Sequence, residues 1–291
     1  MNYSKSHSFL LIGLPSTGKT SFLAALWYAI QQKRSPTALV LRKLDGDSGY
    51  LNKIRDAWLA FRPVGRNPTD TETFVSMWLK RSEDDGEVHL TFPDVSGESF
   101  KQQWTSRQLS VSYDKCLRSA NGGILFIHPT SITLPLRIAE VDNLAGLIDD
   151  DVAKEAASPA IAASPSTRWD IEKTPTQVQL IEILQFLMCQ SHFKPPFRLA
   201  IAISAWDLIA ASQITPDDWI AQQFPLLRQF LSSNRKSFEV AFYGVSAQGG
   251  QYEGDDVTAL QNKNPSLRIE VVGRGVKNKH DITEPILWLM R

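Results

Sequence analysis

The sequence contains few cysteines and no clustered histidines. Cys116 and Cys189 are its two cysteines among 291 residues, and the five histidines are scattered without the spacing of metal ligands. Two cysteines so far apart form neither a disulfide framework nor a zinc site. They are typical of buried free thiols in a reducing compartment. The sequence therefore excludes a disulfide-rich secreted scaffold and a zinc-binding module.

An excess of charge of either sign is also absent. Lys and Arg together number 31, as do Asp and Glu, so the formal net charge is zero. Without a net field, neither nucleic acid nor an anionic membrane surface is favoured as a partner. Function must therefore come from a specific site.

Long apolar runs are missing as well. The run at residues 180–189 contains Glu182 and Gln185 and is too short to span a bilayer. Residues 1–8 are polar, unlike the opening of a signal peptide. We therefore expect a cytoplasmic protein without a membrane span. Its 43% of apolar residues are enough for a sizeable core.

Short apolar runs alternate with segments of helical periodicity along the chain. The runs that predict buried strands of a parallel sheet are residues 8–12, 123–127, 197–204 and 238–245. Residues 73–80 and 87–92 flank a polar turn and predict an antiparallel hairpin. The segments predicted to be helical are residues 19–32, 50–61, 100–119, 176–190, 216–232 and 282–290. This alternation predicts an α/β fold, a mostly parallel sheet covered on both faces.

Three segments depart from this alternation. Residues 35–70 end in a stretch rich in Pro and Gly, and residues 149–175 are rich in Ala, Ser and Pro. Residues 249–279 are polar around one short apolar patch at 269–272. We therefore expect a single domain over residues 1–291, with insertions at about 35–70, 130–175 and 249–280.

Residues 13–20 read GLPSTGKT and match the phosphate-binding pattern G-x-x-x-x-G-K-[ST] at every position. Glycines let backbone N–H groups turn inward around an anion, whereas a Cβ would block that approach. Lys19 would reach the β- and γ-phosphates, the Thr20 hydroxyl would ligate Mg²⁺, and the next helix adds its positive N-terminal end. The preceding strand and following helix favour this interpretation over a chance Gly/Ser turn. The residues predicted to bind phosphate are Gly13, Pro15, Ser16, Thr17, Gly18, Lys19, Thr20 and Ser21.

A second acidic element follows the predicted hairpin. Asp94 and Gly97 form D-x-x-G directly after the strand at residues 87–92. The Asp94 carboxylate would hold Mg²⁺ through a water opposite Thr20, and the Gly97 N–H would contact the γ-phosphate. An ordinary Asp/Gly turn is the competing interpretation. The position after a phosphate loop and a hairpin favours the metal-binding role.

Threonines just before the hairpin are candidates for a further contact to Mg²⁺. Thr69, Thr71 and Thr73 all compete, and counting back along the hairpin favours Thr71. Arg66 and Arg107 are candidate arginine fingers, although a solvated arginine is the simpler interpretation of each. The sequence therefore predicts Thr20, Asp94 and Thr71 as the metal-binding residues.

Two later strand ends carry residues suited to a purine base. Asp207 ends the sequence SAWD after the strand at 197–204, where a carboxylate would accept hydrogen bonds from N1–H and N2–H₂ of guanine. Adenine has an acceptor at N1, which would leave the carboxylate unpaired. Sites of this kind discriminate between the two bases by a factor of roughly 10⁴. The alternative is that Asp207 caps a short helix beginning at Leu208. Ser246 and Ala247 follow the next strand, in a loop whose backbone N–H would contact guanine O6.

Together, five elements stand in the order found in GTPases: GLPSTGKT, the threonines at 69–73, DVSGE, SAWD and VSAQG. They resemble a Ras-like P-loop GTPase domain, which implies a three-layer α/β fold. The opening IGLPSTGKTSFLAALW and the closing DITEPILWL resemble the bacterial double-GTPase families. Members of these families are encoded in multi-gene systems of biological conflict, including phage defence. The resemblance implies GTP or GDP, Mg²⁺, protein partners and a GTP-hydrolysing molecular switch with Lys19, Glu98 and Thr71 as catalytic residues.

Two residues depart from the GTPase pattern. Ala205 replaces a lysine whose stem normally covers the base, which leaves the choice of base open. Glu98 stands where Ras-like GTPases usually carry a glutamine that orients the attacking water. A glutamate would accept the proton of the water but would also repel the γ-phosphate, so the role of Glu98 stays open. We expect hydrolysis to be slow without a partner. The alternatives are an ATPase with the same phosphate loop and a nucleotide-binding scaffold without turnover.

Overall fold

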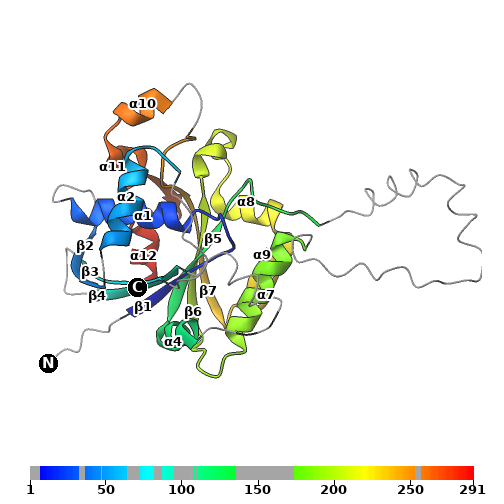
Figure 1. The fold of residues 1–291 in the computed structure, drawn as a ribbon. Helices are drawn as coiled ribbons and strands as arrows, with labels where there is room; N and C mark the ends of the chain where they lie inside the picture. Colours follow the sequence, from blue (N-terminus) through cyan, green and yellow to red (C-terminus); the bar gives the residue numbers. More distant parts are fainter. Residues whose placement is uncertain are drawn as a thin grey trace, which may run out of the picture.

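One sheet of eight strands forms the centre of the fold (Figure 1), in the order β2-β3-β4-β1-β5-β6-β7-β8. The computed structural model describes residues 7–32, 37–46, 48–63, 73–81, 87–94, 106, 108, 111–135, 174–252 and 257–291, with only the backbone at 73, 74, 92–94 and 112. The strands are β1 His7–Ile12, β2 Leu39–Asp45, β3 Thr73–Arg81, β4 Glu87–Asp94, β5 Gly122–Ile127, β6 Phe197–Ser204, β7 Phe238–Ser246 and β8 Glu270–Gly273.

The central strands are parallel and the outer pairs are antiparallel. β1 pairs in parallel with β4 and β5, and β5, β6 and β7 continue the parallel order. β3 runs antiparallel to both β2 and β4, and β8 runs antiparallel to β7. This arrangement confirms the predicted α/β fold, with its mostly parallel sheet and its β3–β4 hairpin.

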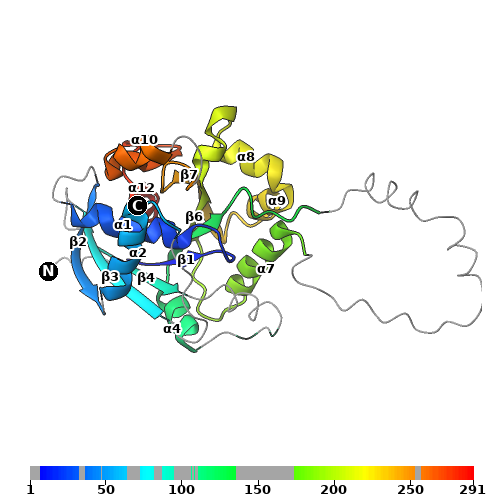
Figure 2. The same cartoon turned by 45° about the horizontal axis from the view of Figure 1, so that its top comes forward.

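Helices cover both faces of the sheet (Figure 2). The α-helices are α1 Lys19–Gln31, α2 Gly49–Leu59, α4 Val111–Ser119, α7 Thr176–Met188, α8 Pro216–Gln223, α9 Pro225–Ser233, α10 Val257–Asn262, α11 Pro265–Arg268 and α12 Glu284–Leu289. The 3₁₀ turns are η2 Trp206–Leu208 and η3 Ala210–Ser212. Within the described residues, every helix is too short or too polar to cross a bilayer.

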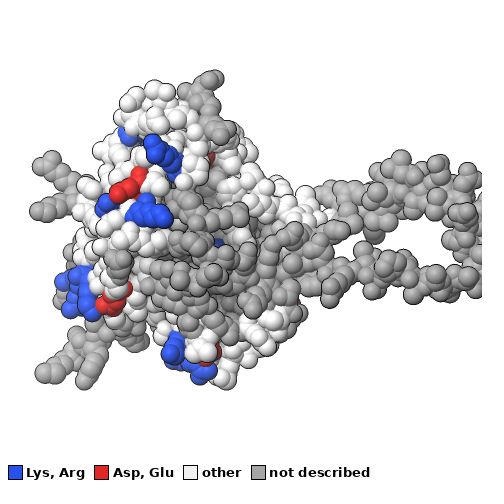
Figure 3. Space-filling view, in the orientation of Figure 1, with Lys and Arg blue, Asp and Glu red and all other residues white. Residues whose placement is uncertain are grey.

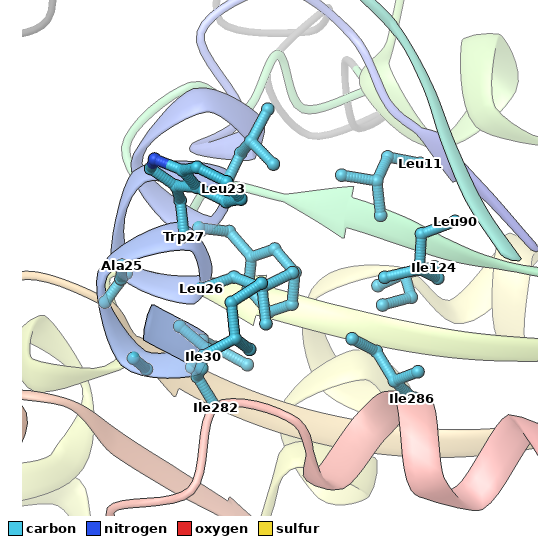
Figure 4. Close-up of a cluster of buried hydrophobic side chains, with 14 of the residues drawn as sticks. Leu11, Leu23, Ala25, Leu26, Trp27, Ile30, Leu90, Ile124, Ile282 and Ile286 are labelled. Atoms are coloured by element: carbon cyan, nitrogen blue, oxygen red, sulfur yellow. The ribbon is translucent and has the colours of Figure 1, made fainter. Parts of the chain in front are cut away.

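Two apolar cores lie on the two sides of the sheet. Phe9 and Leu11 of β1 belong to the core beneath α1, α2 and α12, whereas Leu10 and Ile12 belong to the core beneath α4, α7, α8 and α9. Figure 4 shows the first core, where α1, the sheet and the α12 segment meet. A strand that alternates between two cores must be apolar at every position, which explains the unbroken apolar runs of the sequence.

The two edge strands were not predicted. β2 lies in the segment 35–70 and β8 in the segment 249–280, both of which we expected to be insertions, and both strands extend the sheet. β2 contains Arg42 and Lys43, and much of it is exposed. A partly exposed edge strand needs no continuous apolar run, so β2 lacked the signal used for the central strands. In β8 the apolar patch at 269–272 is short and lies in a polar segment, and we did not interpret it as a strand. The expectation of one domain over residues 1–291 stays a prediction.

Two predicted helices differ from the structure. Residues 216–232 form two helices, because Pro225 has no N–H to continue α8 and instead begins α9. Of the segment 100–119, the structure describes α4 from Val111 onward, together with Ser106 and Gln108. The other predicted helices agree with α1, α2, α7 and α12 to within a few residues.

A buried carboxylate joins the edge of the sheet to the last helix. Asp281 is 2% exposed, and its oxygens accept hydrogen bonds from Ala38 N at 2.8 Å, Thr283 N at 2.8 Å and Thr283 Oγ1 at 2.6 Å. Burial raises the pKa of Asp281, and these hydrogen bonds oppose that rise. The contact with Ala38 links the start of β2 to the approach to α12.

Asp281→Asn should therefore destabilise the fold. The new amide places an N–H₂ against one of the three donors, so we expect the free energy of unfolding to fall by about 1–3 kcal/mol. Urea denaturation measures the change. Asp56→Asn is the matched control, because the Asp56 side chain is 64% exposed and pairs with Arg55, and its effect should stay below about 0.5 kcal/mol. Equal effects of the two variants would contradict the structural role of Asp281.

Candidate functional site

The loop between β1 and α1 has a backbone that requires glycine at two positions. Gly18, before the first turn of α1, has φ +86°, and a Cβ there would lie 2.8 Å from Ser204 Cβ at the end of β6. A Cβ on Gly13, which has φ +153°, would lie 2.9 Å from Phe126 O of β5. Ser16 also has a positive φ, of 59°. The loop is therefore packed tightly against the carboxyl ends of β5 and β6.

The side chains of Lys19 and Thr17 hold this loop in shape. Lys19 Nζ donates hydrogen bonds of 2.7 Å to Gly13 O and of 2.7 Å to Leu14 O. Thr17, which is 5% exposed, donates from Oγ1 to Leu14 O at 2.8 Å. The first N–H groups of α1 point out of the helix toward the loop, as at other helix N-termini. The arrangement is suited to an anion.

Ser21 connects the start of α1 to a distant tyrosine. Burial raises the pKa of Tyr252, and the nearby Ser21 side chain opposes that rise. The Tyr252 ring also packs against Phe61, with ring centroids 5.5 Å apart. The sequence analysis did not identify Tyr252, because nothing in its local sequence indicates a contact more than 200 residues back along the chain.

The structure brings Asp207 and Ser246 together, as neighbouring ends of β6 and β7. The Ser246 hydroxyl donates a short hydrogen bond to the Asp207 carboxylate and accepts one of 3.1 Å from Gly249 N. Asp207 lies inside the 3₁₀ turn η2 and does not cap it, since the residue before η2 is Ala205 and makes no side-chain cap. The interpretation of Asp207 as a helix cap is therefore wrong.

Trp206 fixes the turn that carries Asp207. It is 5% exposed, and its indole lies against Gly244 of β7 so closely that a Cβ built on Gly244 would overlap the ring. Ala205, where the GTPase sequence pattern has a lysine, has left-handed φ 46° and ψ 45°, a conformation that costs about 1–2 kcal/mol in a residue other than glycine. Burial of the indole offsets that strain.

His128 is a further polar residue at this edge of the sheet. It follows β5 directly, and its Nδ1 lies 3.0 Å from Thr130 Oγ1. Burial lowers the pKa of His128, while the negative charge of Asp207 opposes this shift. Its position after a parallel strand was a signal that the sequence analysis did not use.

The backbone of β4 places Asp94 at the same edge as the loop. β4 is parallel to β1, with Leu10 paired to Thr91, and β4 ends at Asp94. Asp94 is also paired with Thr73 at the start of β3. The other residues predicted for this region, Arg66, Thr69, Thr71, Gly97, Glu98 and Arg107, lie outside the described residues.

Charged side chains form small groups of both signs on the face seen in Figure 3, among the residues described there. Among the described residues, no group of three His, Cys, Asp or Glu side chains could hold a metal ion. The described part of the candidate site therefore comprises the loop after β1 and the Asp207–Ser246 pair, with the backbone of Asp94 at the same edge of the sheet.

A family model described as Double-GTPase 1 matches residues 10–289. Bacterial selenocysteine-specific elongation factor EF-Sec is 14% identical with a TM-score of 0.39, over 89% of this chain and 28% of that one. The SRb-GTP/SRX complex of the signal recognition particle receptor from Chaetomium thermophilum is 16% identical with a TM-score of 0.36, over 89% and 97%. The GTP-bound Ski7 GTPase-like domain of S. cerevisiae is 13% identical with a TM-score of 0.37, over 89% and 51%. No curated protein matches the chain.

Gly244→Ala should destabilise the protein through Trp206. Because the added methyl group meets the indole, we expect the free energy of unfolding to fall by about 1–3 kcal/mol, measured by urea denaturation. The same substitution in a Trp206→Leu background should cost less than about 0.5 kcal/mol, because the ring it meets is gone. Equal costs in the two backgrounds would contradict the proposed contact.

Proposed function

The chain belongs to the Double-GTPase 1 family, and from this premise we propose that it is a Mg²⁺-dependent molecular switch that binds and hydrolyses GTP. One observation carries the proposal: the phosphate-type loop after β1 and the Asp207–Ser246 pair after β6 and β7 lie at one edge of a parallel sheet. Ligands of open α/β sheets bind at the carboxyl ends of the strands.

The loop at residues 13–20 would hold the phosphates. Its backbone N–H groups and the N-terminal end of α1 would surround the phosphate oxygens. Lys19 Nζ lies within hydrogen-bonding distance of two loop carbonyls, so a small movement of a flexible side chain would bring it to the β- and γ-phosphates. Ser16 and Thr17 would lie beside the bound phosphates in the middle of the loop, and Pro15 would restrict the conformation of the loop backbone.

The base would be read at the ends of β6 and β7. The Asp207 carboxylate would accept from N1–H and N2–H₂ of guanine, and the backbone N–H of Ala247 would donate to O6. The Ser246 hydroxyl, already bonded to Asp207, would keep the carboxylate in place. Ala205 leaves ATP as the alternative nucleotide, because no lysine stem covers the base.

The donor set fits Mg²⁺. The Thr20 hydroxyl and the Asp94 carboxylate are hard oxygen ligands, and β1 and β4 end at the same edge of the sheet. Mg²⁺ is usually held by one or two protein oxygens together with phosphate and water oxygens. When bound, the ion would neutralise charge on the transferred phosphoryl group.

Hydrolysis would rest on charge stabilisation at this loop. Lys19 would balance the charge that develops on the transferred phosphoryl group. Thr71 and Gly97 would contact the metal and the γ-phosphate in the triphosphate state, and so make two segments sensitive to hydrolysis. Glu98 would face the attacking water, with the rate limited by its own negative charge.

The likeness to double-GTPase families supports a role as one component of a multi-protein bacterial system, such as one that acts in phage defence. Such a switch acts on a protein partner rather than on a metabolite. A scaffold that binds nucleotide without turnover is the alternative. Phosphate release with GTP in large excess over protein separates the two, because more than one phosphate per chain requires turnover.

Lys19→Ala should abolish tight binding of GTP. Charge-assisted hydrogen bonds are worth about 1.5–3 kcal/mol each, so we expect the Kd, measured by isothermal titration calorimetry, to rise by about 100-fold or more. Multiple-turnover phosphate release should disappear as well. Lys236→Ala is the matched control, because Lys236 is exposed in the turn between α9 and β7. An unchanged affinity of Lys19→Ala for GTP would rule out the phosphate-binding loop.

Asp207→Asn should change the preferred base. The carboxylate becomes an amide. Its oxygen would still accept a hydrogen bond from N1–H, but its NH₂ group would face N2–H₂ of guanine, whereas it would donate to O2 of xanthine. We expect the Kd for GDP to rise by about 10-fold or more and the Kd for xanthosine diphosphate to fall. Competition against a fluorescent guanine nucleotide measures both. If ADP displaces that probe from the unchanged protein as well as GDP does, the ATPase alternative is correct.

A further inference from the structure

A reciprocal pair of hydrogen bonds joins α2 to the loop after β7. Trp58 Nε1 donates to Ala247 O at 3.0 Å, and Gln248 Nε2 donates to Trp58 O at 3.3 Å. Both bonds are buried, and Trp58 itself is 0% exposed. Buried hydrogen bonds of this kind hold a backbone in one conformation, since each is costly to leave unmade.

α2 is in turn fixed to α1, the helix that follows the phosphate-type loop. Trp27 Nε1 of α1 donates to Asn52 Oδ1 of α2 at 3.0 Å. The rings of Tyr28 and Trp58 pack with centroids 5.2 Å apart. The position of Trp58 is therefore set by the element that begins at Lys19 and Thr20.

Arg268 packs against Trp58 from another side. Its guanidinium carbon lies 4.8 Å from the centre of the Trp58 ring and 5.6 Å from that of Phe61. Arg268 is 1% exposed, and its Nε and Nη1 have no hydrogen-bond partner among the described residues. A buried cation is costly, and stacking on aromatic rings is its main compensation here. A Cβ on Gly249, which has φ +86°, would lie 2.6 Å from Arg268 O. The loop at 246–249 is thus in close contact with both α2 and α11.

We propose that Trp58 is a positioning residue for base recognition, an inference that rests on the proposed function. It fixes the peptide between Ala247 and Gln248 with the Ala247 carbonyl away from the base. The preceding peptide is thereby restrained as well, so that the loop presents the Ala247 N–H to the base. An N–H donor suits O6 of guanine. A carbonyl turned toward the base would repel O6 and would accept a hydrogen bond from the N6 amino group of adenine. Trp58 therefore sets which donor and acceptor pattern the loop reads, although it does not touch the nucleotide.

Trp58→Phe tests this role, because it removes the indole N–H and keeps an aromatic ring against Arg268 and Tyr28. Calorimetry with GDP, IDP and ADP measures the effect. IDP keeps O6 but lacks the amino group read by Asp207. We expect the Kd for GDP and for IDP to rise together by about five- to tenfold, the loss of one hydrogen bond, while the Kd for ADP changes by less than about twofold. The ratio of ADP to GDP affinity should rise and the ratio of IDP to GDP affinity should stay constant.

Trp78→Phe is the matched control. Trp78 Nε1 donates to Asp45 Oδ2 at 2.8 Å in the β2–β3 edge of the sheet, so the same substitution removes a similar bond away from the site. It should leave all three nucleotide affinities unchanged. If Trp58→Phe does not fold, Gln248→Met removes the second bond to Trp58 with little change of volume. It keeps the Trp58–Ala247 bond but loosens the same junction, so the affinities should change in the same direction and by a smaller factor.

An equal loss of affinity for all three nucleotides would show a general structural role and overturn the proposal. Unchanged affinities would overturn it as well. A change confined to the ratio of IDP to GDP would assign the effect to Asp207 instead. If the unchanged protein shows no preference for GDP over ADP, the proposed function itself fails, and the positioning role fails with it.

Discussion

The structure depends on burying β1 on both faces. Because Phe9 and Leu11 enter one core and Leu10 and Ile12 the other, β1 can only lie in the middle of a covered sheet, between β4 and β5. This position forces the chain to leave β1 at an edge shared with the ends of β5 and β6. Gly13 and Gly18 then meet Phe126 and Ser204 at distances that exclude a side chain. The shape of the loop thus follows from the packing of the strand before it.

The same constraint brings together residues that are far apart in sequence. Parallel neighbours end on one side, so Asp207 after β6 meets Ser246 at the end of β7. The edge strands β2 and β8 widen the sheet beyond these central strands. They also extend the first core over Leu39 and Val271. Helix α2 and the segment before α12 pack over that core, and α2 thereby reaches the loop at 246–248. What we expected to be an insertion contributes both to the sheet and to the surroundings of the site.

The sequence predicted those elements whose residue types are required by local structure alone. Apolar runs predicted β1, β5, β6 and β7, because strands covered on both faces need them; Arg198 and Glu239 interrupt the runs of β6 and β7 only near their starts. The glycines, lysine and threonine of residues 13–20 indicated the loop, because a backbone that turns its N–H groups toward an anion needs glycine at fixed positions. The edge strand β2 gave no such signal, since Arg42 and Lys43 can face solvent. The contacts of Trp58 with Ala247 and of Ser21 with Tyr252 join residues that only the fold brings together. From sequence alone, a tryptophan such as Trp58 is assigned to the hydrophobic core, because its hydrogen-bond partner is unknown.

Ala205 shows how the parts of the site depend on one another. In GTPases that carry a lysine at this position, its stem covers the base, and stacking adds to the contacts made at the edge of the ring. Here the left-handed turn at Ala205 directs Trp206 into the core against Gly244. A base in this site would be held mainly by hydrogen bonds at its edge, whose strength depends on good alignment. Alignment in turn requires a rigid frame, and the described structure supplies one: Ser246 bonded to Asp207, and Trp58 bonded to Ala247. Under the proposed function, the absence of a covering lysine and the buried bonds to α2 would therefore act together, with a rigid loop in place of stacking on the base.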